Sequence, residues 1–178
     1  MYRIAIALLA FATVVASAAP NEQKDFSGQW KMDTTRSESA HHGVPIGSVT
    51  LFIQQTATEL RVKTITNYRD SSERASTETL AYNLNGSENL VFSESGVEVK
   101  TRARREGAAL VTEAVQVING APVTAQHVLN LAAGGKELTI DKTLRVQHGY
   151  QAGSGNNTGR GRDVFVRVVT ESRGPNPK

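Results

Sequence analysis

The chain has 178 residues, of which 39% are hydrophobic and 21% charged, which is enough for one domain with a sizeable core. Twenty Lys and Arg against 17 Asp and Glu give a net charge of +3, and this small excess argues against a nucleic-acid-binding surface. The absence of cysteine excludes disulfides, thiolate metal sites and cysteine nucleophiles.

The first 18 residues have the pattern of a secretory signal peptide. Arg3 precedes the apolar run Ile4–Val15, and Ala16-Ser17-Ala18 has the A-x-A form that signal peptidases accept. The run is shorter than the roughly 20 residues that a membrane span needs. We therefore expect cleavage near Ala18 and a soluble protein in a secreted or periplasmic fraction, and the lack of cysteine favours a bacterial one.

From Asp25 onward, apolar residues recur at every second position, and Gly, Asn, Asp and Ser interrupt them. This pattern predicts strands over Phe26–Met32, Val49–Gln55, Leu60–Thr66, Ala75–Leu84, Glu88–Ser93, Val97–Arg104, Leu110–Ile118, Val123–Leu131, Leu138–Val146 and Val164–Val169. Asn85-Gly86 and Asn119-Gly120 are strong two-residue hairpin signals. The remaining segments are a loop over Thr34–Gly47 with room for one helical turn, a mobile loop over His148–Arg162 and a disordered tail over 171–178.

About ten strands at short spacing, with no helical pattern between them, predict an all-β domain over residues 25–170. Short connections favour antiparallel, up-and-down order. Because no helix is available to cover an apolar sheet face, we expect the sheet to close into a barrel of about 8–10 strands.

The segment Phe26-Ser-Gly-Gln-Trp-Lys-Met32 resembles the F-x-G-x-W-K opening strand of the calycins, meaning lipocalins and fatty-acid-binding proteins. The whole mature chain is also similar to small secreted bacterial lipocalin-like proteins. The resemblance implies that Trp30 plugs the closed end of the barrel, that Gly28 makes room for it, and that Arg167 or Arg145 covers the indole. The R-x-Y carboxylate clamp of fatty-acid-binding proteins is not carried over, because Arg167 is followed by Val168 and Val169.

Alternation places one set of side chains in the lumen. The aliphatic candidates for ligand contact are Leu51, Ile53, Val62, Val97, Val99, Leu129 and Ile140, and the polar candidates are Glu113, His127 and Lys142. Glu113 belongs to this set only if the Val111 phase of its strand faces inward, and the Leu110 phase is the alternative. The phase of Val123–Leu131 is open too, and His127 faces the lumen only if Leu129 and Leu131 do. The polar groups either orient a ligand or satisfy one another near a wet mouth.

No cofactor, metal or catalytic residue is assigned. The sequence lacks G-x-S-x-G, H-E-x-x-H and P-loop motifs. His41 and His42 are adjacent rather than spaced as converging ligands, and only His127 is placed to ligate a haem in the lumen. Gly159-Arg-Gly-Arg162 has no helix behind it to form an anion site.

The sequence favours a protein, monomeric or weakly dimeric, that holds a small, largely apolar molecule in its lumen. Thr34–Gly47 or Gln151–Arg160 would act as a lid. The first alternative is a cell-envelope interaction module with a filled barrel and no catalysis. The second is an enzyme that uses a converging pair such as Glu113 with His127.

Overall fold

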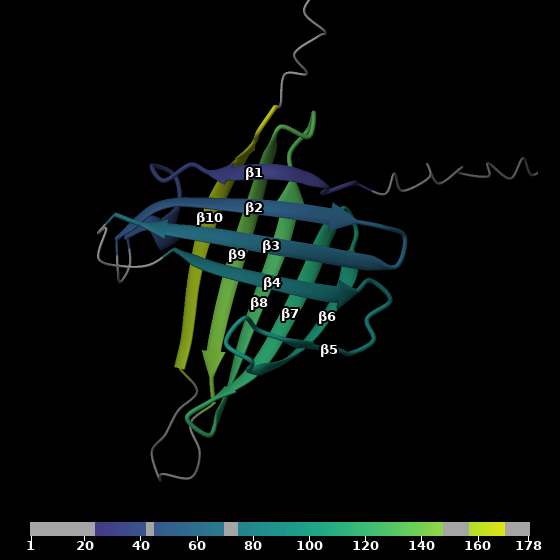
Figure 1. Ribbon diagram of the computed structural model, residues 1–178. Coiled ribbons are helices and arrows are strands. Elements are labelled where there is room, and N and C mark those ends of the chain that lie inside the picture. Colours follow the sequence, from purple (N-terminus) through teal and green to yellow (C-terminus); the bar gives the residue numbers. More distant parts are fainter. Residues whose placement is uncertain (1–23, 42–44, 70–74, 148–156, 170–178) are drawn as a thin grey trace, which may run out of the picture.

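The computed structural model describes residues 24–41, 45–69, 75–147 and 157–169, which form one antiparallel barrel (Figure 1). Its elements are β1 (Gly28–Met32), the 3-10 turn η1 (Glu38–His41), β2 (Ile46–Gln55), β3 (Glu59–Tyr68), β4 (Ser76–Asn83), β5 (Asn89–Phe92), β6 (Glu98–Glu106), β7 (Ala109–Ile118), β8 (Ala121–Leu131), β9 (Glu137–Val146) and β10 (Asn157–Arg167). Within these ranges no helix has the length and apolar character to span a membrane. The predicted signal peptide and tail lie outside the described residues.

The sheet confirms the predicted all-β, up-and-down barrel. Its strand order is β4-β3-β2-β1-β10-β9-β8-β7-β6-β5, and every ladder is antiparallel. The first and last strands pair, with Trp30 opposite Arg167. Figure 1 shows β1–β4 crossing in front of β6–β10, so that the two halves of the sheet enclose the core.

The ladder is interrupted between β4 and β5, a place that we call the seam. Side chains bridge it: the Asn89 Nδ2 donates to the Ala81 carbonyl at 3.2 Å, and the Thr101 hydroxyl donates to the same oxygen at 2.5 Å. The barrel is therefore nearly closed, with side-chain hydrogen bonds in place of a backbone ladder at one position.

The two Asn-Gly signals have different outcomes. Asn119 (φ 50°) and Gly120 (φ 78°) form the tight turn between β7 and β8, as the sequence predicts. Asn85 instead accepts hydrogen bonds from the Ser87 amide and hydroxyl, at 2.9 and 2.7 Å, and the strands on either side diverge. The predicted hairpin here is wrong, because the four-residue β5 pairs with β6 alone.

The strand β10 begins seven residues before its predicted start at Val164. Residues 157–162 were expected in a loop, but they pair with β9, with Gly161 opposite Lys142. Residues 158–160 and 162 are exposed, so this part of the strand shows no apolar alternation in the sequence. The rest of that predicted loop, residues 148–156, lies outside the described residues.

A fully buried aromatic cluster closes one end of the barrel. Trp30 donates through Nε1 to the Phe26 carbonyl at 3.0 Å, and both side chains are inaccessible to solvent. The Arg167 Cζ lies 4.2 Å from the centroid of the indole ring. Its guanidinium also donates to the carbonyls of Ser27 at 2.6 Å and Gly135 at 2.7 Å. Cation–π stacking and two charge-assisted hydrogen bonds therefore seal this end.

Gly28 allows this close approach. Its φ is +140°, and a Cβ built there would lie 2.6 Å from the Arg167 Nη1. Any side chain would thus be strained and would displace the guanidinium. Arg145, the other residue expected over the indole, is exposed on β9.

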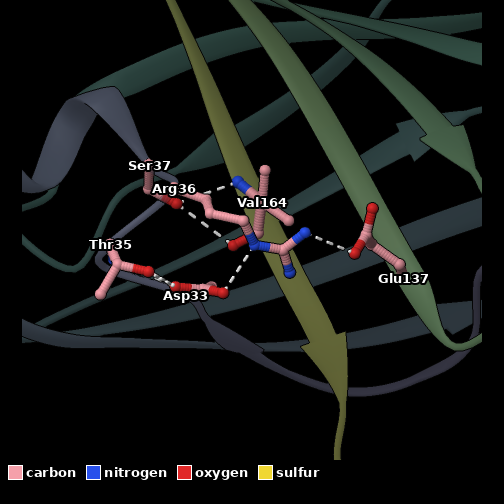
Figure 2. Close-up of polar contacts among 6 residues, drawn as sticks. All are labelled: Asp33, Thr35, Arg36, Ser37, Glu137 and Val164. Carbon is pink, nitrogen blue, oxygen red and sulfur yellow. Dashed lines mark hydrogen bonds and ion pairs between the residues drawn. The ribbon is translucent and has the colours of Figure 1, made fainter.

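The segment between β1 and η1 is fixed to the last two strands by polar contacts (Figure 2). The Ser37 hydroxyl accepts from the Val164 amide at 2.9 Å and donates to its carbonyl at 3.2 Å. Arg36 donates to Asp33 at 2.7 Å and to Glu137 on β9 at 2.8 Å. These contacts hold η1 against β10, beside the lumen.

Candidate functional site

The interior of the barrel contains a cavity of about 170 Å³. Seven apolar side chains line it, namely Val49, Leu51, Ile53, Val62, Leu129, Ile140 and Phe165. Six polar residues complete the wall, namely Thr64, Glu78, Tyr82, Thr112, His127 and Lys142. Apolar walls with a few convergent polar groups are typical of small-molecule sites, although this cavity is smaller than the range of roughly 300–1,000 Å³ common for them.

One ion pair lies at the wall of the cavity. The Lys142 ammonium on β9 pairs with Asp163 on β10, whose side chain is fully buried. Ser39 on η1 donates to the same carboxylate through its amide at 3.0 Å and its hydroxyl at 2.7 Å. Burial alone would raise the pKa of Asp163, but the Lys142 charge and the hydrogen bonds from Lys142 and Ser39 outweigh it and lower the pKa. The buried carboxylate is thus ionised and compensated.

His127 lies on β8 between Thr112 of β7 and Lys142 of β9, each directly opposite it in the ladders. Burial and the Lys142 charge lower the pKa of His127 to about 4, against an opposing effect of Asp163. The imidazole is therefore neutral at pH 7, with one nitrogen as a donor and the other as an acceptor.

A second polar group lies on β4. The Tyr82 side chain is buried, and burial together with the nearby Glu78 raises the pKa of its phenol well above the usual range, against a smaller opposing effect of Thr112. The phenol is thus a neutral hydroxyl at every ordinary pH. Partial desolvation raises the pKa of Glu78, an exposed residue that lines the cavity four positions before Tyr82 on the same face of β4.

Most of the residues proposed from the sequence for ligand contact are brought together here. Those that line the cavity are Leu51, Ile53, Val62, His127, Leu129, Ile140 and Lys142. Val99 is buried in the core but does not contribute to the cavity wall.

Two more of the proposed residues do not line the cavity. Glu113 is paired with Arg102 at 2.5 Å, away from the cavity, because Leu110 and Thr112 are the inward residues of β7. Val97 is 39% exposed, because β6 begins one residue later and Val97 lies in the preceding turn. The predicted alternation has the correct phase for Val99, but the predicted strand begins before the observed first residue of β6, Glu98.

The structure also shows lumen residues that the sequence analysis missed. Asp163 lies on the same face of β10 as Phe165 and Arg167. The expected position of Arg167 over the indole could therefore have predicted that Asp163 points inward. Glu78 and Tyr82 share the inward face of β4 with Leu80. That strand is polar enough that its phase was not readable from hydrophobicity.

The catalytic pair considered from the sequence does not converge, because Glu113 is turned away from the lumen that His127 lines. Within the described part of the chain, no group of three His, Asp or Glu side chains is arranged to hold a metal ion. His42 and His148 lie outside that part.

No protein-family model matches the sequence, and no curated protein matches it significantly. Solved structures similar to it include the REP1-NXSQ fatty acid transporter, at 15% identity and a TM-score of 0.48 over 82% of this chain and 97% of that chain. The fatty-acid-binding protein of Drosophila melanogaster brain tissue has 18% identity and a TM-score of 0.47, over 80% and 99% of the two chains. Fatty-acid-binding protein 1 of Echinococcus granulosus has 14% identity and a TM-score of 0.45, over 81% and 98%. At such identities and scores, the ligands of those proteins are not assigned to this chain.

Proposed function

We propose that this chain is an exported protein that binds a small, largely apolar molecule in the barrel lumen. The observation that carries the proposal is the internal cavity of about 170 Å³, with its apolar wall and its polar groups from β4, β7, β8 and β9. An engineered protein cavity of about 150 Å³ with an apolar lining takes up benzene, so this volume is sufficient for a ligand. Removal of apolar ligand surface from water supplies roughly 25 cal/mol per Å².

The export part of the proposal rests on the pattern of the first 18 residues. The mass of the protein recovered from the secreted or periplasmic fraction of its own organism tests it. We expect the mass of a chain that starts at Ala19. Recovery of the protein in the cytoplasm with the mass of the full chain from Met1 would contradict export.

Native mass spectrometry of the same material, before and after denaturing extraction, tests ligand binding. We expect a released small molecule. The matched variants Thr64→Phe and Lys63→Phe show whether it occupies the lumen, because Thr64 lines the cavity and Lys63, its neighbour on β3, is exposed. The Thr64 variant should lose the molecule and the Lys63 variant should keep it.

If both variants retain the molecule, it is bound outside the lumen. If the unaltered protein carries no small molecule and takes up none of the probes described below, the alternative function is favoured, namely a cell-envelope interaction module. Circular dichroism and a Tm for each variant separate loss of binding from loss of fold.

A further inference from the structure

We infer that the lumen selects an uncharged molecule of about one ring with a hydrogen-bonding group at its edge, and that it rejects the corresponding carboxylate. This inference rests on the proposed function, because it specifies the chemical class of the ligand. Charge balance, hydrogen-bonding groups and volume each contribute to it.

The cation in the cavity wall already has an anionic partner. Among the described residues that line the cavity, Lys142 is the one cation, and its ammonium is paired with Asp163 and donates to the Ser39 hydroxyl at 3.3 Å. A ligand carboxylate would have to draw Lys142 away from Asp163, which would leave a fully buried carboxylate without its partner. The alternative is to bury a second carboxylate beside the first, in a cavity whose wall also includes the exposed Glu78.

The remaining polar groups are suited to a neutral partner. Thr112 and His127 are directly opposite in the β7–β8 ladder, and Tyr82 of β4 lines the same cavity. A neutral imidazole offers one donor and one acceptor, and each hydroxyl can do both. An amide, a hydroxyl or a carbonyl on the ligand can use these groups without the desolvation of a full charge.

The volume limits the size of the ligand. About 170 Å³ is close to the cavity of about 150 Å³ that holds benzene, and it is below the usual range for drug-sized molecules. A single ring with a small substituent fits this space, and a long acyl chain would have to extend out of it.

The test compares benzamide with benzoate, which have the same ring and a planar group of the same shape but differ in charge at pH 7. Affinities are measured by NMR titration of the full-length mature protein. We expect benzamide to bind at least about tenfold more tightly than benzoate, because transfer of an unpaired charge out of water is costly. The Thr64→Phe variant should abolish benzamide binding, and Lys63→Phe should not.

The variant Asp163→Asn removes the internal partner of Lys142. Its benzoate affinity should rise at least about tenfold while its benzamide affinity changes little, because Lys142 then has an unused positive charge. Benzoate binding to the unaltered protein as tightly as benzamide would overturn the inference and leave the proposed function intact. Binding of neither probe would overturn the inference, and it would overturn the proposed function as well if the unaltered protein also releases no small molecule on denaturing extraction. The comparison on the unaltered protein stands even if Asp163→Asn does not fold.

Discussion

Acidification should destabilise the barrel through His127. Its pKa is lowered from 6.5 to about 4 in the folded protein, so the unfolded chain binds the proton first. The full contribution to stability is present above pH 6.5 and is lost as the pH falls toward 4. Each pKa unit corresponds to about 1.4 kcal/mol, which gives a total loss of about 3 kcal/mol and a loss of about 2 kcal/mol between pH 7 and pH 5.

Other ionisable groups face the imidazole and must be separated from it. The lowered pKa of Asp163 places the protonation of its carboxylate, which is destabilising, below that of His127. Glu78 acts in the opposite sense, because its pKa is raised and its protonation favours the folded state. Comparison with a His127→Gln variant cancels these contributions.

Urea unfolding at pH 7 and pH 5, followed by the fluorescence of the one tryptophan, measures the free energy of unfolding for both proteins. The unaltered protein should lose about 2 kcal/mol more than His127→Gln over this interval. An equal loss in the two proteins, or an NMR titration of His127 with a pKa near 6.5, would refute the reasoning.

Three further substitutions test other parts of the structure by the same urea unfolding. Arg167→Leu removes two charge-assisted hydrogen bonds and the stacking over Trp30, and should cost about 3–5 kcal/mol; a loss below 1 kcal/mol would contradict the sealing role. Gly28→Ala places a methyl group 2.6 Å from the Arg167 Nη1 and should cost about 1–3 kcal/mol, and unchanged stability would show that the guanidinium moves freely. Glu113→Gln breaks a pair with the exposed Arg102, and should change stability by less than about 1 kcal/mol and leave benzamide affinity unchanged; weaker binding would place Glu113 in the site after all.

The fold was predictable because period-2 alternation is a local signal. The strand β2 has one apolar face over most of its length, so both its existence and its inward residues follow from the sequence. The start of β10 was not predictable, since residues 158–160 are exposed and only backbone pairing with β9 makes them a strand. The lack of pairing between β4 and β5 after Asn85 depends on the arrangement of the whole barrel, so a two-residue turn signal cannot predict it.

The candidate site was predictable where aliphatic residues set the phase of a strand. His127 and Lys142 were found because they alternate with Leu129 and Ile140. Glu113 was misplaced because β7 has apolar residues in both phases: Leu110 and Val111 are both buried. The partner of Lys142 was missed because pairing between β9 and β10 depends on register, which the sequence of β10 does not state.

The position of the seam has a consequence for the order of the chain. Val168 donates to the Gln29 carbonyl at 2.8 Å, so the last described residues lie beside the first strand. A linker between the two ends, with new termini opened near Gly86, would give a circular permutant in which every neighbouring pair of strands is also consecutive along the chain. The one ladder that now joins residues more than a hundred positions apart would become a local hairpin. Since folding slows as the sequence separation of contacts grows, the permutant should reach the same barrel sooner than the natural order does.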